Sequence, residues 1–247
     1  MKKSAEAIPL RRRAPEWVEQ ESRFARSVLI FAAIAGLLFA GIFAALPRLD
    51  IHIAGLVFDG DDFWLQGSDF WWWLRRLMMT GFGIFYAVII VGVFSAWLKR
   101  TVVWTLYPLE WLYLVLCSLL GPLLLTNVIL KDNIGRPRPR SITEFGGDLV
   151  YKSVFMPGGG CDGNCSFVSG EVSSMVMIFA SLLFIMPGWR KLWLFILFPA
   201  WGFSAFLRIG EGAHFASDTL LAGTFMIAVA ALLYWSMFLN GSGGVRK

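Results

Sequence analysis

Residues 208–218 read RIGEGAHFASD and place three chemically capable side chains in one short segment. These are Arg208, His214 and Asp218. A histidine can act as a nucleophile or a base when a carboxylate fixes its tautomer, and a guanidinium group can hold an anionic substrate. Because strongly apolar stretches flank the segment, it fits a polar loop between two membrane helices equally well, so the rest of the chain must decide between these interpretations.

The elements that must position these side chains are hydrophobic. Of the 247 residues, 57% are hydrophobic and 16% are charged, whereas soluble domains have about 25% charged residues. Apolar runs of about 20 residues recur, and each is long enough to cross the hydrocarbon core of a bilayer, about 30 Å. The sequence therefore predicts an all-α polytopic membrane protein with six transmembrane helices in one bundle. The predicted spans are 27–46, 77–98, 108–130, 168–187, 192–207 and 216–238.

The distribution of lysine and arginine predicts how these spans are oriented. If the spans alternate in direction, most cations fall on one side, which the positive-inside rule assigns to the cytoplasm. These cations are Lys2, Lys3, Arg11, Arg12, Arg13, Arg23, Arg26, Lys99, Arg100, Arg190, Lys191, Arg246 and Lys247. We expect both termini in the cytoplasm, with a basic N-terminal segment (1–26), a six-helix membrane domain (27–238) and a tail (239–247). No strip of basic and aromatic residues indicates a nucleic-acid partner, and we infer no obligate protein partner.

A second group of cations falls on the opposite, outer side, against this bias. A dense cluster on the disfavoured side indicates a site for an anionic group, and contact with anionic lipid headgroups is the alternative. The cluster consists of Lys131, Arg136, Arg138, Arg140 and Lys152 after the third span and Arg208 after the fifth. Ser169 and Gly170 open the fourth span on the same side, where the exposed N–H groups of a helix N-terminus favour an anion. We expect these three segments to converge across the helices.

The loop 50–76 differs in character, because it mixes aspartates with aromatic residues. Asp59, Asp61, Asp62 and Asp69 lie among tryptophans and phenylalanines, which is typical of the aromatic belt at a membrane interface. Since no histidine lies among these aspartates, a solvated acidic loop is favoured over a metal site. His52, alone near the interface, is interpreted as structural.

Taken together, the three outer segments resemble the type 2 phosphatidic acid phosphatase (PAP2) superfamily of six-helix lipid phosphate phosphatases. The family pattern is a Lys, six residues and Arg-Pro; then Ser-Gly-His; then an Arg, five residues, a His, three residues and an Asp. The residues that fit it are Lys131, Arg138, Pro139, Ser169, Gly170, Arg208, His214 and Asp218. The joint occurrence of the three elements is specific, and the resemblance runs from about the second span to the end of the chain.

The resemblance implies a mechanism without a metal or another cofactor. His214 would attack phosphorus and form a phosphohistidine, while Asp218 would orient its ring. The oxygens of the phosphoryl group would be held by Lys131, Arg138, Ser169, the Gly170 amide and Arg208, whose fixed charges stabilise the transition state.

Glu171 departs from the family pattern, which usually has a histidine that protonates the leaving oxygen. Glu171 is a general acid tuned by burial, a residue that orients water, or a partner of Lys131 or Arg208; these alternatives stay open. A leaving group that needs little protonation would also suit a glutamate. The simplest alternative is that Glu171 favours the start of the fourth span through the helix dipole.

The second element of the pattern, with Glu171 in place of the usual histidine and CDGNC just before it, resembles that of bacterial lipid A phosphatases within the family. This implies dephosphorylation of lipid A on the periplasmic face of the inner membrane. The 1-phosphate is favoured over the 4′-phosphate because an anomeric oxygen is a good leaving group.

Other functions remain as alternatives to lipid A dephosphorylation. The nearest are an undecaprenyl pyrophosphate or phosphatidylglycerophosphate phosphatase of the same family, and a phosphotransferase would differ only in its acceptor. A pseudophosphatase that binds lipid phosphate without turnover is the non-enzymatic alternative, motivated by Glu171. A transporter gains little support, because the charged residues cluster at the ends of spans rather than at their centres.

Two of the three cysteines, Cys161 and Cys165, lie in a glycine-rich outer loop. That compartment permits disulfides, and one here would fix the approach to Ser169. A disulfide is favoured over a metal site, since two thiols without a nearby histidine make a poor ligand set. Cys117, within the third span, is interpreted as a packing residue.

Overall fold

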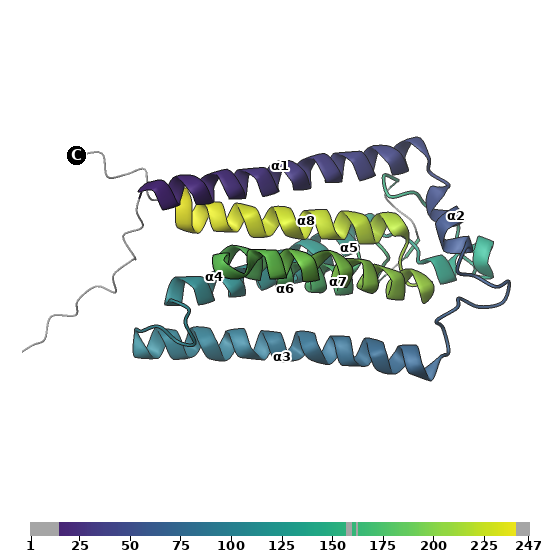
Figure 1. The fold of residues 1–247 in the computed structure, drawn as a ribbon. Helices are drawn as coiled ribbons and strands as arrows, with labels where there is room; N and C mark the ends of the chain where they lie inside the picture. The colour runs from purple at the N-terminus through teal and green to yellow at the C-terminus, as the bar shows by residue number, and fades with distance from the viewer. Residues whose placement is uncertain (1–14, 157–159, 162, 241–247) are drawn as a thin grey trace, which may run out of the picture.

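The computed structural model describes residues 15–156, 160–161 and 163–240, and this part of the chain is helical without a β-strand. The α-helices are α1 (Pro15–Ala45), α2 (Leu49–Gly55), α3 (Asp69–Lys99), α4 (Pro108–Ser118), α5 (Lys131–Ile134), α6 (Gly170–Ile185), α7 (Arg190–Gly210) and α8 (Ala216–Tyr234). Helix α4 continues as a π-helix over Leu119–Leu130, and α8 does so over Trp235–Leu239. The long helices run side by side, and α2 lies at one end of them (Figure 1).

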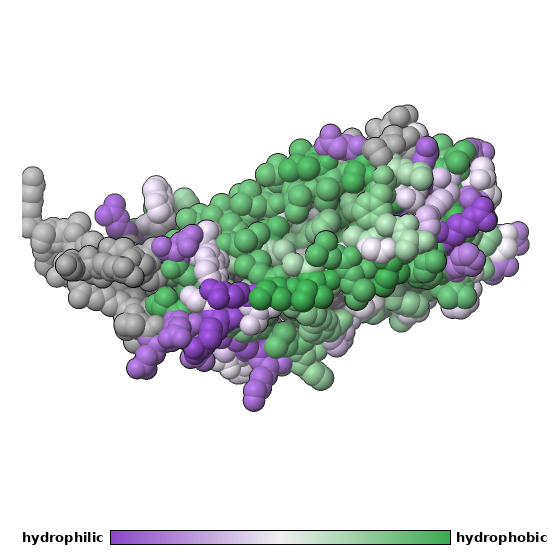
Figure 2. All heavy atoms as spheres, turned by 90° about the horizontal axis from the view of Figure 1, so that it is seen from above, coloured by the Kyte–Doolittle hydropathy of each residue, from purple (hydrophilic) through white to green (hydrophobic). Residues whose placement is uncertain are grey.

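Within the described residues, five helical segments are long and apolar enough to cross a membrane. They are Glu16–Ala45, Asp69–Lys99, Pro108–Leu130, Pro187–Gly210 and Ala216–Leu239. Figure 2 shows a hydrophobic surface over the middle of the molecule, with hydrophilic residues gathered towards its ends. The all-helical membrane architecture is therefore confirmed. Helix α6 is apolar but shorter than these five, so the sixth span stays a prediction.

Helix α6 lies largely inside the protein rather than at its surface. It packs against both α7 and α8, and most of its side chains are buried. By contrast, α1 and α7 expose large apolar side chains: Leu37 is 74% exposed and Phe195 is 77% exposed. Hydrocarbon lipid tails solvate such side chains as well as a protein core does. Helix α6 therefore carries Ser169, Gly170 and Glu171 on a support enclosed by other helices.

Helices α1 and α3 begin earlier than the spans predicted at 27 and 77. In α1 the additional turns carry Glu21, which accepts a hydrogen bond from Tyr234 at 2.9 Å and pairs with Arg190. Hydropathy detects only the apolar part of a helix, so polar turns that pack at its end are missed. Residues 15–26 of the expected N-terminal segment are thus helical. The cations at 2, 3 and 11–13, and tail residues 241–247, lie outside the described residues.

A small aromatic cluster joins α2 and the loop after it to the turn between α7 and α8. Its buried members are Ala54, Phe63, Ile142, Phe145 and Phe215. The Leu65 amide donates to the Gly210 carbonyl at 3.0 Å, and Phe63 lies so close to Gly212 that a Cβ there would come within 2.3 Å of its ring. Gly212 also has a φ of +59°, which favours glycine. This contact fixes the turn that carries His214.

Candidate active site

His214 lies in the turn between α7 and α8 and is buried. Its Nδ1 is 2.6 Å from the Ser166 carbonyl oxygen. Because a carbonyl oxygen can only accept, Nδ1 carries the ring proton and Nε2 keeps its lone pair. The pKa of His214 is lowered to about 4, mainly by burial and also by Arg208 and Arg138, while Asp218 acts in the opposite direction. At neutral pH the ring is therefore neutral, the form that a nucleophile requires.

Asp218, in the first turn of α8, is 3.9 Å from Nδ1 of His214. Its Oδ2 instead accepts from the Ser166 hydroxyl at 2.5 Å and from the Phe215 amide at 2.9 Å. Ser166 thus links the two residues, since its hydroxyl binds Asp218 and its carbonyl binds His214. The carboxylate acts on the ring mainly through this serine, a residue that the sequence analysis did not single out.

Arg136 holds the other oxygen of Asp218 and was expected only as one cation among several. It is buried and donates to Asp218 Oδ1 at 2.5 Å and to Asp50 Oδ2 at 2.7 Å. Its guanidinium lies 4.2 Å from the centre of the Phe215 ring. Burial alone would lower the pKa of Arg136, but Asp218 and Asp50 hold this pKa above its ordinary value. Asp50, from α2, also accepts from the Ser217 amide at 2.9 Å and had no recognisable sequence signal.

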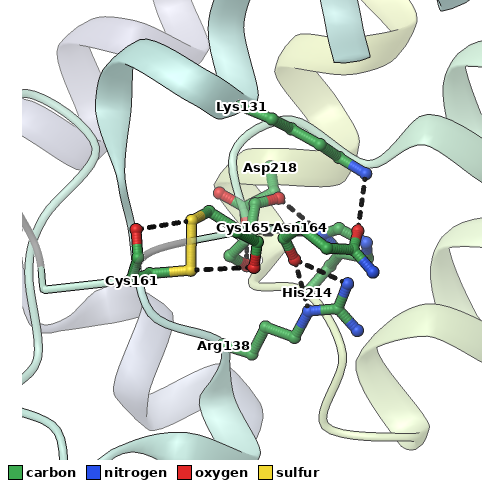
Figure 3. The surroundings of a disulfide bond; sticks show 9 residues. Lys131, Arg138, Cys161, Asn164, Cys165, His214 and Asp218 are labelled. Atoms are coloured by element: carbon green, nitrogen blue, oxygen red, sulfur yellow. Dashed lines mark hydrogen bonds and ion pairs between the residues drawn. A yellow bond between two sulfur atoms is a disulfide. The ribbon is translucent and has the colours of Figure 1, made fainter. Parts of the chain in front are cut away.

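Lys131 and Arg138 approach His214 from the loop after the third span, and both bind Asn164 (Figure 3). Burial lowers the pKa of Lys131, and Arg138 and Arg208 lower it further. Burial also lowers the pKa of Arg138 to about 10, together with the nearby charges of Arg140, Arg208 and Arg75. These cations repel one another, which an anion placed among them would relieve.

Two buried polar atoms of the expected phosphate site have no hydrogen-bond partner among the described residues: Ser169 Oγ and Arg208 Nε. Such unpaired buried groups are rare and need an explanation, for example a ligand. A Cβ on Gly170 would lie 3.5 Å from Lys131 Nζ, so this ammonium reaches the N-terminus of α6. The Ser169 amide donates to the Asp218 carbonyl at 3.3 Å, which joins this helix end to α8.

Glu171 faces two arginines. Arg75 of α3 donates to it through Nη2 at 2.5 Å and through Nε at 3.1 Å, and Arg208 Nη1 lies 3.4 Å away. The sequence offered Lys131 or Arg208 as a partner of Glu171. The structure shows the contact with Arg208 and adds one with Arg75. Glu211 also pairs with both arginines. A carboxylate between two guanidinium groups is held in its ionised form, which makes it a poor proton donor.

The structure joins Cys161 and Cys165 in a disulfide with a Cα–Cα distance of 5.8 Å. Cys117 is a free cysteine and is buried in the main hydrophobic core.

All eight residues proposed for catalysis or phosphate binding lie at the same end of the molecule, linked by the contacts described above. They are Lys131, Arg138, Ser169, Gly170, Glu171, Arg208, His214 and Asp218.

Comparison with known proteins places these residues in a family context. The sequence model of the PAP2 superfamily matches residues 110–242. A lipid A 4′-phosphatase from Francisella tularensis subsp. novicida is 31% identical over 218 residues, which cover 84% of this chain and 96% of that protein. Proteins of the same name from Rhizobium leguminosarum and Rhizobium etli are each 40% identical over 121 residues, covering 47% of this chain and 49% and 45% of theirs. No solved structure matches the chain significantly.

The burial and tautomer of His214 can be measured directly, because the chain has only two histidines. In a His52→Gln variant every histidine NMR signal comes from His214. We expect Nδ1 to be protonated and the ring to stay neutral as the pH falls from 7, titrating at about pH 4 rather than at the ordinary 6.5. A nitrogen-15 NMR titration in detergent micelles measures both properties. Titration near 6.5, or a ring protonated at Nε2, would contradict the described site.

Proposed function

Because the chain belongs to the PAP2 superfamily and is a membrane lipid phosphatase, we propose that it removes the 4′-phosphate of lipid A through a phosphohistidine at His214. The observation that carries this proposal is the neutral His214 beside Arg138 and Arg208. Ser169 Oγ and Arg208 Nε, which are buried and have no partner in the part of the chain that the structure describes, would complete the phosphate site. The named relatives support the choice of lipid A.

In the first step, Nε2 of His214 attacks phosphorus, the P–O bond to the sugar breaks and an N–P bond forms. Lys131, Arg138, Arg208 and the Ser169 hydroxyl stabilise the phosphoryl oxygens, where charge is concentrated in the transition state. The imidazolium that results is stabilised by the Ser166 carbonyl oxygen, 2.6 Å from Nδ1, and by the nearby Asp218. Water then hydrolyses the N–P bond and releases phosphate. These residues supply the charge that the reaction needs without a metal ion.

We further propose that Glu171 acts as an anchor for arginines rather than as the general acid. Its carboxylate binds Arg75 at 2.5 Å and lies 3.4 Å from Arg208. This pairing draws α3 towards α6 and holds Arg208 near the phosphate. The leaving oxygen would then take its proton from water or from the substrate.

The choice between the two phosphates of lipid A rests on different arguments. Leaving-group chemistry favours the 1-phosphate, whose anomeric oxygen departs easily. The names of the three relatives favour the 4′-phosphate, and one of them is covered over 96% of its length. We give more weight to the relatives. If Glu171 anchors arginines, its presence is explained without a good leaving group, and the argument for the 1-phosphate becomes weaker. The undecaprenyl pyrophosphate and phosphatidylglycerophosphate alternatives have no such support.

The homologues and the apolar helices indicate a bacterial membrane protein. We propose that it lies in the inner membrane with both termini in the cytoplasm and the site facing the periplasm. The positive-inside distribution of cations supports this orientation. All the site residues, including Asp50 and Arg75, fall within the proposed membrane domain, 27–238.

Phosphate release from purified lipid A tests the proposed function. We expect the wild-type protein to release phosphate in EDTA, and His214→Ala to lower the rate by at least about 1,000-fold because the nucleophile is lost. Mass spectrometry of the product distinguishes loss of the 4′-phosphate from loss of the 1-phosphate. Inhibition by EDTA would contradict the mechanism. Binding of lipid A without turnover by either protein would indicate a pseudophosphatase.

The role of Glu171 is tested by varying the leaving group. If Glu171 anchors Arg75 and Arg208, Glu171→Gln should lower the rate by roughly tenfold to a hundredfold, equally for alkyl and aryl phosphate esters. A general acid would be needed only for the poor alkyl leaving group, so a loss confined to alkyl esters would refute the anchor. The exposed Glu144, changed to Gln, is the matched control.

The orientation is tested with single cysteines in a Cys117→Ser background. We expect Asp61→Cys, at the site end, to react with a membrane-impermeant maleimide in spheroplasts, because this loop faces the periplasm. Lys99→Cys, at the other end of α3, should react only after the membrane is permeabilised. The reverse labelling pattern would contradict the proposed orientation.

A further inference from the structure

Asn164 contacts two cations of the phosphate site with two different oxygens. Its backbone carbonyl accepts from Arg138 Nη2 at 2.7 Å and from Nε at 3.0 Å. Its side-chain oxygen accepts from Lys131 Nζ at 3.3 Å. Figure 3 shows both side chains converging on Asn164 from different sides. One residue thus sets the positions of the lysine and the arginine of the first sequence element.

The neighbours of Asn164 in the chain connect it to the nucleophile. Cys165 forms the disulfide with Cys161, and Ser166 binds both His214 and Asp218. The Ser166 amide donates to the Arg136 carbonyl at 2.8 Å, so this segment is held at the residue after Cys165. On the other side of Asn164, the disulfide ties Cys161 to Cys165. Asn164 therefore lies between two fixed points.

We propose that Asn164 is a positioning residue that sets Lys131 and Arg138 for the substrate phosphate, and that the disulfide between Cys161 and Cys165 holds Asn164 in place. The inference rests on the proposed function, because it concerns the same phosphate site. Neither Asn164 nor the disulfide contacts the reacting atoms in this scheme. Their effect is on the affinity of the site for a phosphoryl group.

The contacts leave the cations able to bind a substrate. A guanidinium group has five N–H donors, and the Asn164 carbonyl uses only the edge formed by Nε and Nη2, so Nη1 stays available. An ammonium group has three donors, and Asn164 accepts one of them. Fixing long, flexible side chains before binding reduces the entropy lost when the phosphate arrives.

The backbone of Asn164 explains why this position depends on its surroundings. Its φ is +47°, in the left-handed region that asparagine adopts more readily than most residues. A short loop closed by a disulfide restricts the chain to few conformations. Reduction by dithiothreitol transfers two electrons and converts the disulfide into two thiols, which removes this restriction. The Asn164 carbonyl is then free to leave Arg138.

Binding of inorganic phosphate, measured by calorimetry on the full-length protein in detergent, tests the proposal. A Cys117→Ser background leaves the disulfide as the only redox-active pair in the chain. We expect reduction, or Cys161→Ser with Cys165→Ser, to raise the Kd for phosphate by about tenfold. Asn164→Gly, which removes the side-chain amide that binds Lys131 but tolerates the left-handed φ and keeps the backbone carbonyl, should raise it less. For lipid A hydrolysis we expect KM to rise by a similar factor while kcat changes by less than about threefold.

The nitrogen-15 signal of His214 shows whether reduction acts on the cations or disrupts the site. We expect the ring to keep its Nδ1 proton after reduction, because Ser166 remains bound to Asp218 and Arg136. An unchanged phosphate Kd in the reduced protein overturns the proposal, and so does loss of the His214 signal. Because phosphate binding needs no turnover, redox-dependent binding without lipid A hydrolysis would support this inference while refuting the proposed function. Hydrolysis with redox-independent binding would do the reverse.

Discussion

The buried ion pairs of Arg136 with Asp50 and Asp218 are the interaction on which the rest of the site depends. Arg136 Nη1 reaches Asp218 at 2.5 Å and Nη2 reaches Asp50 at 2.7 Å. The same guanidinium also donates to the Ser217 hydroxyl and to the Lys152 carbonyl, and it lies over the Phe215 ring. Loss of one partner from a buried ion pair costs about 3–5 kcal/mol, because the other charge is left without compensation. This arrangement joins α2, the loop after α5 and the start of α8. It therefore fixes the carboxylate that positions Ser166 and, through Ser166, the histidine.

Charge is divided between two regions of the site. Asp50 and Asp218 compensate the buried guanidinium of Arg136. The positive charges of Arg138 and Arg208, by contrast, act on His214, and Lys131 lies near both arginines. In the free site this surplus of positive charge disfavours a protonated ring, whereas the phosphoryl group of the intermediate brings the negative charge that compensates an imidazolium. The same surplus favours a dianionic phosphate ester. Burial is the main reason that the nucleophile is neutral, and the cations that add to this effect also favour the anionic substrate.

Helix α3 takes part in the site through Arg75, a residue that the sequence analysis placed only in the loop before the second predicted span. Glu171 and Glu211 hold this arginine next to Arg208. The pairing accounts physically for a glutamate where the family pattern has a histidine. A histidine there could not form two ion pairs with arginines, so the departure from the pattern and the position of α3 are connected.

The sequence by itself determined the features that depend on composition or local spacing. Apolar runs predict membrane helices because lipid excludes unpaired backbone groups, and the spacing of His214 and Asp218 puts them at one helix start. The disulfide between Cys161 and Cys165 was also expected, because the predicted topology places this loop outside, and the structure contains it. Helix starts were misplaced where a polar segment extends α1 and a tryptophan-rich segment extends α3. Only the tertiary structure identified Asp50 and Arg75, which lie 86 and 96 residues from their partners Arg136 and Glu171. A single charged residue has no periodic pattern, and its role arises only when folding brings a distant opposite charge to it.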